Sequence, residues 1–272
     1  MSGRRRIYLL RHGQVPYFGP ERAARAEEVA LSETGREQAR AAGRLLKGIR
    51  FDRVVTSGLR RTVETAELVL EEAGGPSPAI EARPALHEIR GGSVDHLPDE
   101  QLDEVFLGLL RPPVSLDAAF LAGETLGQLD ERVVPAVEAL LDEQWETLLL
   151  VSHGGVNRVV LSLALTGGQV LLGNLEQHPG CINILDVDDP GPDARHWIVH
   201  AVNIVPTDLV TRDRRTTTME DMLAEYRAAR AAGQRPTSSA VSSWVGGWPG
   251  RPRGAGGARW SAAARVRPRR RP

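Results

Sequence analysis

In two segments of the chain, a short apolar run is followed by a histidine and then by a glycine. Residues 7–10 lead into Arg-His-Gly at 11–13, and residues 148–151 lead into Ser-His-Gly-Gly at 152–155. In an open α/β sheet, ligands bind beyond the carboxyl ends of the strands. If both apolar runs are strands of one sheet, the two imidazoles meet at that edge and face a common ligand.

A third apolar run, residues 53–56, is followed by two adjacent arginines, Arg60 and Arg61, at the predicted start of a helix. The backbone N–H groups at a helix start favour an anion, and guanidinium groups match phosphate oxygens. Two histidines and at least two arginines at one edge of a sheet therefore predict a phosphate pocket.

Each of these features alone also has a structural explanation. A histidine after a strand is often a hydrogen-bonded structural residue, and an arginine pair at a helix start is usually surface charge. The repetition of the arrangement favours a ligand site. The glycine after each histidine supports it further, because a missing side chain leaves room for a ligand to approach the backbone.

Short aliphatic segments alternate with longer amphipathic ones, which is typical of an α/β domain with a largely parallel sheet. The predicted strands are residues 7–10, 53–56, 147–152, 181–187 and 196–202, the last two joined by a turn at 188–192. The predicted helices are residues 32–47, capped by Ser32, 59–72, and 124–143, with a kink at Pro135.

The composition, with 41% hydrophobic and 25% charged residues, is that of a globular protein with a buried core. No segment approaches the roughly 18 to 20 apolar residues of a membrane-spanning helix, and the apolar stretch after the basic N-terminus is too short for a signal peptide. Cys181 is the only cysteine, so an internal disulfide is excluded. We therefore expect a cytoplasmic protein without a membrane partner.

Residues 236–272 differ from the rest of the chain. They contain eight arginines and no acidic residue, so that residues 1–235 carry a formal charge of −9 within the overall −1. Rich in Gly, Pro and Ser and without periodicity, they are predicted to form a disordered tail after a catalytic domain at 1–235. An arm for nucleic acid is the alternative, but arginine runs alone are weak evidence, and we do not expect a nucleic-acid partner.

Taken together and in order, the motifs resemble those of the histidine phosphatase superfamily, the phosphoglycerate mutase-like proteins. The segments that carry the resemblance are residues 11–13, 31–39, 56–67, 86–92, 123–132 and 151–155, within about residues 5–205. The resemblance implies a three-layer α/β/α sandwich with a mostly parallel central sheet.

The resemblance also implies a role for each candidate residue. His12 is the expected nucleophile, which attacks phosphorus through a ring nitrogen and forms a phosphohistidine. Arg11, Arg61 and His153 hold the phosphate oxygens, and Glu88 acts as general acid and then as general base. We expect His12 to be neutral before attack and His153 to be a cation that faces the phosphate charge. The scheme requires no metal ion and no other cofactor.

Some of the polar residues also have other interpretations. Glu88 could form only a solvated ion pair with Arg90. Glu124 and Arg132, eight residues apart, are interpreted as a structural polar contact. Both histidines and the glutamate form a plausible zinc set, but the neighbouring arginines argue against it, because they repel a cation and attract a phosphate.

The sequence departs from the family where an asparagine usually helps to bind phosphate, since Phe18 stands there in the apolar segment 15–20. We interpret this as a preference for a substrate with an aromatic or apolar part. The arginine and tyrosine that follow the glutamate in glycolytic mutases are also missing. The sequence thus predicts a phosphomonoester hydrolase for a small phosphorylated metabolite. The alternatives are a mutase-type phosphotransferase and a non-catalytic phospho-ligand binding module, and a homodimer stays open.

Overall fold

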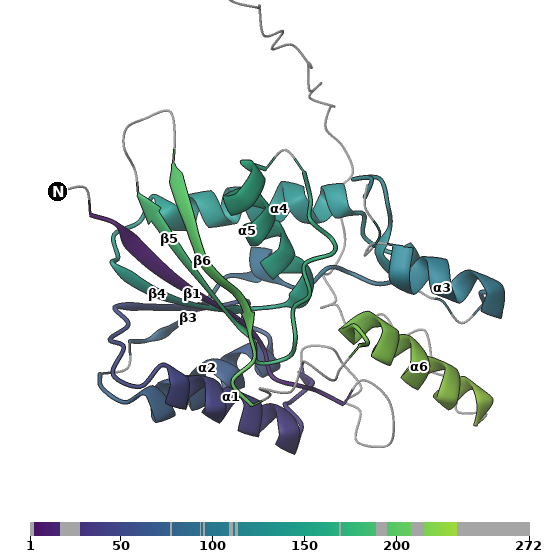
Figure 1. Cartoon of the computed structure of the whole chain (residues 1–272), viewed down its shortest axis with the longest axis horizontal. Helices are drawn as coiled ribbons and strands as arrows, with labels where there is room; N and C mark the ends of the chain where they lie inside the picture. Colours follow the sequence, from purple (N-terminus) through teal and green to yellow (C-terminus); the bar gives the residue numbers. More distant parts are fainter. Residues whose placement is uncertain are drawn as a thin grey trace, which may run out of the picture.

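The computed structural model describes residues 3–16, 28–76, 78–92, 94, 96–108, 111, 114–168, 170–188, 195–207 and 215–232. Within them, a central sheet is covered by helices on both faces (Figure 1). Its strands are β1 (Arg5–Arg11), β2 (Arg53–Thr56), β3 (Ile80–Ala82), β4 (Thr147–Ser152), β5 (Ile182–Asp188) and β6 (His196–Ile204). The predicted α/β sandwich is confirmed.

The strand order is β3-β2-β4-β1-β5-β6, and the first four strands pair in parallel. β5 runs antiparallel to both of its neighbours, so the sheet is mixed but mostly parallel, as expected. β1 and β4 are neighbours in register, with Arg11 opposite Ser152. This pairing brings the two histidine segments out of the sheet side by side.

The helices of the two outer layers are α1 (Glu33–Leu45) and α2 (Arg60–Ala73) on one face and α4 (Leu126–Leu141) and α5 (Gly154–Thr166) on the other (Figure 1). Ser32 caps α1 as predicted, because its Oγ accepts a hydrogen bond from Gly35 N at 3.0 Å. The predicted helix at 124–143 corresponds to α4, which continues through Pro135.

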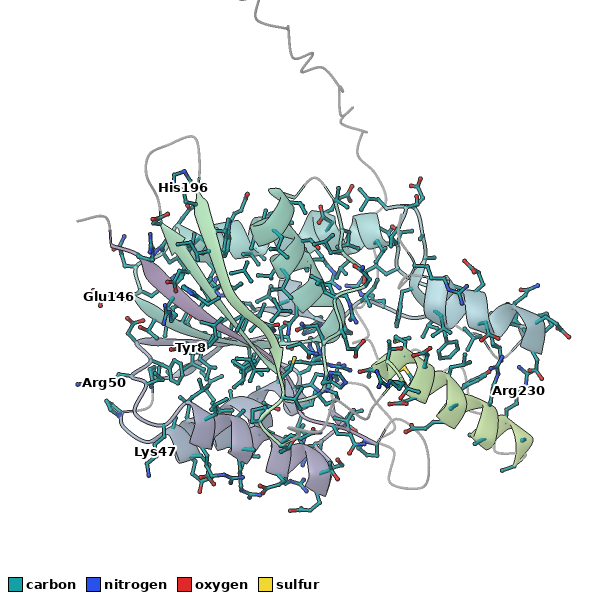
Figure 2. All side chains as sticks on the ribbon, in the orientation of Figure 1. Tyr8, Lys47, Arg50, Glu146, His196 and Arg230 are labelled. Carbon is teal, nitrogen blue, oxygen red and sulfur yellow. The ribbon has the colours of Figure 1, made fainter. Side chains whose placement is uncertain are left out.

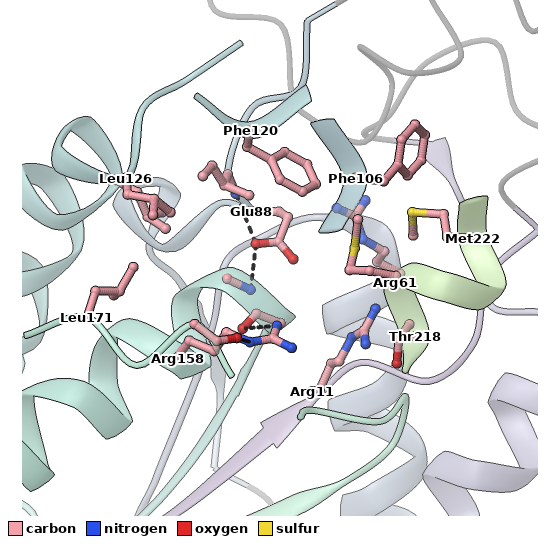
Figure 3. Close-up of a pocket in the computed structure, with 16 residues that line it drawn as sticks. Arg11, Arg61, Glu88, Phe106, Phe120, Leu126, Arg158, Leu171, Thr218 and Met222 are labelled. Atoms are coloured by element: carbon pink, nitrogen blue, oxygen red, sulfur yellow. Dashed lines mark hydrogen bonds between the residues drawn. The ribbon is translucent and has the colours of Figure 1, made fainter. Parts of the chain in front are cut away.

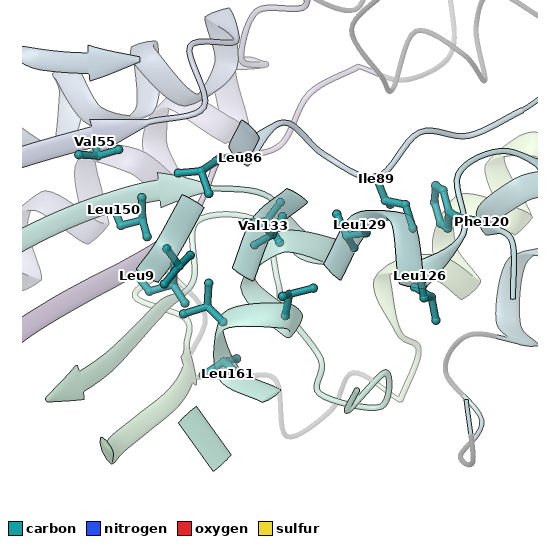
Figure 4. Packing of buried hydrophobic residues seen from close by; sticks show 14 of the residues in the cluster. Leu9, Val55, Leu86, Ile89, Phe120, Leu126, Leu129, Val133, Leu150 and Leu161 are labelled. Atoms are coloured by element: carbon teal, nitrogen blue, oxygen red, sulfur yellow. The ribbon is translucent and has the colours of Figure 1, made fainter. Parts of the chain in front are cut away.

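Alternate residues of β1 face opposite layers, as a strand in the middle of a sandwich must. Leu9 packs with Leu150 and Val133 in the cluster under α4 and α5 (Figure 4). Tyr8 and Leu10 belong to the separate cluster under α1 and α2. The burial on both faces holds β1 rigidly, and its carboxyl end is therefore a well-defined position for a reactive side chain.

Two further helices, α3 (Asp99–Leu107) and α6 (Thr218–Ala231), lie together beyond the carboxyl ends of β1 and β4 (Figure 1). The rings of Phe106 and Tyr226 join them, with centroids 5.6 Å apart. Arg230, labelled in Figure 2, ties them again by an ion pair with Asp99 at 3.1 Å. Two short 3₁₀ turns, η2 (Pro84–Leu86) and η4 (Phe120–Ala122), complete this end of the molecule.

Several predictions fall on residues that the structure does not describe. Phe18 and the segment around it, most of the predicted turn at 188–192, and the predicted tail at 236–272 lie outside the described residues. The interpretations attached to them stay predictions.

Candidate active site

The two histidines of the predicted pocket lie against each other. His12 follows β1 and His153 follows β4, and their ring centroids are 5.1 Å apart with an angle of 66° between the ring planes. The backbone N–H of His12 donates to the carbonyl of Ser152 at 3.0 Å, which fixes one segment to the other. Both side chains are buried. The structure therefore brings the two imidazoles together at this edge of the sheet.

The hydrogen bond of His12 determines which ring nitrogen is reactive. Nδ1 lies 2.7 Å from the carbonyl oxygen of Gly13. A carbonyl can only accept, so Nδ1 carries the hydrogen and Nε2 keeps its lone pair. Burial, and then the charges of Arg61 and Arg11, hold the pKa of His12 well below its usual value. The ring is therefore neutral at pH 7, as expected for a nucleophile.

The protonation of His153 depends on whether an anion is bound. Burial, followed by the charge of Arg61, lowers the pKa of His153 well below its usual value. Without a ligand the ring is therefore neutral, because a buried imidazole beside guanidinium groups loses its proton more easily than one in water. The expected cation that faces a bound phosphate stays a prediction. A phosphate dianion against the ring would act in the opposite direction and raise this pKa.

A chain of hydroxyl groups orients the ring of His153. Thr62 Oγ1 donates to the carbonyl of Leu59 at 2.7 Å, so Ser57 Oγ, 3.0 Å from Thr62 Oγ1, must donate to it. Ser57 Oγ then accepts from His153 Nε2 at 2.8 Å. The remaining nitrogen, Nδ1, is buried without a hydrogen-bond partner among the described residues. Nδ1 is thus the atom that can take up a proton and donate it to an anion.

Arg11 and Arg61 line one pocket at the carboxyl edge of the sheet (Figure 3). Both side chains are buried, whereas Arg60 is exposed. Arg61 stands in the first turn of α2, and Arg11 is the last residue of β1, where its Nη1 donates to the carbonyl of Gln177. Their charges reach His12, whose pKa both lower. Of the two adjacent arginines, Arg61 therefore lines the pocket and Arg60 does not.

Glu88 lines the same pocket as the two arginines (Figure 3). Its Oε1 accepts from the backbone N–H groups of Ile89 at 2.9 Å and Gly155 at 3.0 Å. Its Oε2 makes no hydrogen bond within the described part of the chain, and an ion pair with Arg90 does not occur there either. Glu88 is therefore held by one oxygen and presents the other, so the solvated ion pair is not observed.

Gly13 and Gly155 are required by close contacts within the protein. For Gly154, which lines the pocket beside Arg11 and Arg158, the interpretation as room for a ligand stays a prediction. A Cβ on Gly13 would lie 2.2 Å from the carbonyl oxygen of Gly35, so this glycine allows α1 to approach β1. A Cβ on Gly155 would lie 2.5 Å from Glu88 Oε1. Glycine at 155 is therefore a condition for the contact that holds the candidate acid.

The ion pair of Glu124 and Arg132 is structural, as interpreted from the sequence. Arg132 Nε and Nη2 bond the two carboxylate oxygens of Glu124 at 2.8 and 3.0 Å. Arg132 also donates to the carbonyls of Ala85, His87 and Glu88, at 2.8, 2.7 and 2.9 Å. The pair thus fastens the backbone that carries Glu88.

Arg158, on α5, lines the pocket but was not predicted from the sequence. Its Nε donates to Gly173 O at 3.0 Å, its Nη1 to Gly154 O at 3.2 Å, and its Nη2 lies 3.5 Å from Glu176 Oε2. Its position five residues after His153 places it one turn into a helix that begins at the histidine. Recognising α5 as a helix would have revealed it.

Buried amides behind Arg11 were also missed. Gln177 and Asn183 have no exposed surface and share two hydrogen bonds of 2.9 and 2.8 Å. Asn157 joins them through its Nδ2, 3.0 Å from Gln177 Oε1. Since the backbone of Gln177 accepts from Arg11, this network supports the guanidinium. Amide residues scattered along the chain give no signal of it in the sequence.

The rest of the pocket is apolar. Beyond its four charged residues, the lining is formed mainly by aliphatic, aromatic and methionine side chains, namely Ile89, Phe106, Phe120, Leu126, Leu129, Leu171, Met219 and Met222. In Figure 3 the labelled members of this set, Phe106, Phe120, Leu126, Leu171 and Met222, lie around the pocket. The site combines a cationic floor, formed by arginines that can bind a phosphate, with an apolar wall.

Among the described residues, no three or more His, Cys, Asp or Glu side chains are grouped so as to hold a metal ion. The described helices are all too short or too polar to cross a membrane.

Comparisons with known proteins identify the family. A model of the histidine phosphatase superfamily (branch 1) matches residues 7–200. A 2,3-bisphosphoglycerate-dependent phosphoglycerate mutase of Parvibaculum lavamentivorans is 32% identical over 196 residues, which cover 68% of this chain and 91% of the relative. A broad-specificity phosphatase of Saccharomyces cerevisiae is 30% identical over 162 residues, which cover 57% of this chain and 68% of that protein.

Solved structures agree with this match. A mycobacterial glucosyl-3-phosphoglycerate phosphatase in complex with inorganic phosphate is 25% identical, with a TM-score of 0.59, and the similarity covers 74% of this chain and 98% of that one. The matched segment, 7–200, contains both histidines, both buried arginines and Glu88. The chain therefore belongs to the histidine phosphatase superfamily, branch 1.

Proposed function

We propose that this protein is a phosphomonoester hydrolase that transfers the phosphoryl group of a small phosphorylated metabolite first to His12 and then to water. The observation that carries the proposal is the contact of His12 Nδ1 with Gly13 O, which leaves Nε2 as the nucleophile, while burial and two guanidinium groups hold the pKa of the ring below its usual value. This arrangement combines a nucleophile at neutral pH with cations that balance the phosphate charge.

In the first step, Nε2 of His12 attacks phosphorus and the bond from phosphorus to the ester oxygen breaks. Glu88 gives its proton to the departing alcohol oxygen, for which a positioned carboxyl group typically contributes 10² to 10⁴ in rate. Arg11 and Arg61 bind the non-bridging oxygens, where charge-assisted bonds are strongest. His153 donates to another oxygen once the anion has raised its pKa.

In the second step, water replaces the alcohol. The Glu88 carboxylate accepts a proton from the water, whose oxygen attacks the phosphohistidine, and the bond from phosphorus to Nε2 breaks. Inorganic phosphate leaves, and His12 and Glu88 return to their initial protonation states. The same carboxyl group serves both steps because alcohol and water occupy the same side of the phosphoryl group in turn.

Phosphoglycerate mutation is the second candidate, since several relatives bear that name. A mutase must hold the phosphoglycerate by its carboxylate, so that the second hydroxyl oxygen can take the phosphoryl group back from the enzyme. The apolar wall of this pocket favours release of the alcohol instead. We therefore rank hydrolysis first and non-catalytic phosphate binding last, because the nucleophile and the candidate acid are both present.

The experiment measures phosphate release from a panel of phosphorylated metabolites by the wild type and His12→Ala in parallel. A second assay follows the isomerisation of 3-phosphoglycerate with 2,3-bisphosphoglycerate supplied. We expect release in the first assay that depends on His12, and little turnover in the second. Isomerisation that exceeds phosphate release would replace the proposal by mutase activity. Equal phosphate release in the variant would overturn the role of His12.

A further inference from the structure

We infer that the pocket selects phosphomonoesters whose alcohol part is apolar, and that α6 supplies the part of the wall that recognises it. The inference rests on the proposed function for the phosphate end of the ligand. It adds the chemistry of the other end, which is determined by residues outside the phosphate machinery.

Few of the residues that line the pocket carry a charge. Among the described lining residues, the charged ones are Arg11, Arg61, Glu88 and Arg158. The first three are assigned to the phosphate and the leaving oxygen. A substrate whose phosphate lies there must place its alcohol part against the apolar wall (Figure 3). Burying apolar surface there is favourable, whereas burying a second charge without a partner is costly.

Arg158 already has an anionic partner. Its nitrogens contact the carbonyls of Gly173 and Gly154 and the carboxylate of Glu176, whose charge offsets that of the guanidinium. An incoming carboxylate or phosphate would have to share Arg158 with Glu176. A bisphosphate or a phosphorylated acid therefore finds one cationic subsite in the described lining, not two.

α6 is held over the pocket by the same glutamate. Glu176 Oε1 accepts from the backbone N–H of Thr218 at 3.2 Å and from the hydroxyl of Thr218. This contact anchors the first turn of α6, and Met219 and Met222 of that helix line the pocket. Arg158, Glu176 and Thr218 thus form a link from the floor of the pocket to its wall.

α6 lies beyond residues 7–200, the segment that the family model matches. The residues proposed for phosphoryl transfer therefore lie in the matched segment. Part of the pocket wall that would contact the substrate comes from outside it. Methionine side chains are flexible and polarisable, so they fit apolar groups of varied shape. This favours a range of apolar alcohols over one rigid substrate.

A series of n-alkyl phosphates tests the inference. Ethyl, butyl and hexyl phosphate have chemically similar leaving alcohols and differ in apolar surface. Full burial of one methylene corresponds to about a fourfold gain. We expect kcat/KM to rise with chain length, by at least about tenfold from ethyl to hexyl phosphate, and 3-phosphoglycerate to be poorer than hexyl phosphate. A flat or falling series, or a preference for 3-phosphoglycerate, would overturn the inference while the hydrolase proposal stands.

Binding of the matching alkylphosphonates, which cannot be hydrolysed, separates the two proposals. We expect their Kd to fall along the same series. If affinity rises with chain length and no phosphate is released from any ester, the apolar selection stands and the hydrolase proposal fails. If the Kd does not change along the series, the inference fails whatever the activity.

Variants of α6 test the origin of the selection. Met219 is partly exposed and lines the pocket. Met219→Gln keeps the length of the side chain but adds a polar amide, and we expect it to reduce the dependence on chain length by several-fold. Met219→Leu should restore the dependence. Ala224→Ser, at an exposed position of the same helix, is the control and should match the wild type. If the Gln and Leu variants have the same dependence on chain length, α6 does not recognise the alcohol.

Discussion

Gly155 donates its backbone N–H to Glu88 Oε1 at 3.0 Å, and a Cβ at position 155 would lie 2.5 Å from that same oxygen. A side chain at position 155 would therefore push the Glu88 carboxylate away from this contact. The start of α5 therefore does two things at once: its first residues follow His153, and its second glycine positions the candidate acid. The backbone amide of Gly155 therefore links the position of His153 to that of Glu88.

Replacing Gly155 by alanine should displace Glu88. We expect kcat/KM for an alkyl phosphate to fall about 10²-fold, within the range that general acid catalysis contributes. The check is a double-mutant cycle of Gly155→Ala and Glu88→Gln. If the two substitutions act through the same carboxylate, their effects are strongly non-additive. Fully additive losses would show that Gly155 acts in some other way.

Arg61 and Arg60 form a natural matched pair, since one is buried in the pocket and the other is exposed. We expect Arg61→Ala to lower kcat/KM by about 10² to 10³, the usual effect of removing one group that stabilises developing charge. Arg60→Ala should stay within about twofold of the wild type. Similar losses for both variants would indicate a general effect of charge and contradict the assignment.

The buried histidines make stability depend on pH. In the unfolded chain an imidazole takes up a proton near pH 6.5, whereas the folded protein lowers the pKa of both His12 and His153. The unfolded state therefore binds more protons below about pH 6.5. The free energy of unfolding must then fall as the pH is lowered through this range, and neither ring affects it above.

Urea unfolding between pH 7.5 and 5 measures this effect. Each ring contributes a slope of up to about 1.4 kcal/mol per pH unit. We expect His12→Asn and His153→Asn each to have a shallower slope than the wild type, whatever their absolute stability. Identical slopes in all three proteins would mean that the rings titrate alike in the folded and unfolded states.

The Glu124–Arg132 pair should matter for both stability and turnover. Glu124→Gln leaves a partly buried guanidinium without its charge partner, and we expect the free energy of unfolding to fall by about 3 kcal/mol. Because Arg132 holds the carbonyl of Glu88, kcat should fall more than KM changes. The exposed pair Arg111–Glu104 provides the control, where Glu104→Gln should cost less than about 1 kcal/mol. Equal costs at both sites would contradict the structural role.

The strands and the meeting of the histidines could be predicted because they depend on local sequence. Apolar runs of four to six residues ending in polar residues indicate buried parallel strands, and the sheet edge then determines where His12 and His153 lie. The assignment of Arg61, and not Arg60, to the phosphate depends on the resemblance to the family. Burial of Arg61 and exposure of Arg60 follow from the turn of α2.

Other features depend on tertiary packing and left weak signals. α5 begins with two glycines, which are poor helix formers, directly after His153. α6 did have a signal, the capping box of Thr217 and Glu220, but it follows a stretch without clear periodicity. The neutral state of His153 follows from its burial beside Arg61, and no local pattern reports that.

The apolar wall shows the same limit. Phe106, Phe120 and Met222 come from α3, η4 and α6, which are far apart in the sequence and meet only in the folded protein. The sequence suggested an apolar substrate from Phe18, which lies outside the described residues. The pocket supports the same preference through different side chains.

Detection of the phosphorylated enzyme tests the central claim most directly. The protein is mixed with 4-nitrophenyl phosphate, whose good leaving group needs no general acid, quenched in alkali and analysed by mass spectrometry. We expect one phosphoryl group on His12, more of it in Glu88→Gln because the second step lacks its base, and none in His12→Ala. Phosphate release without a phosphorylated protein, or a phosphoryl group on another residue, would contradict the account.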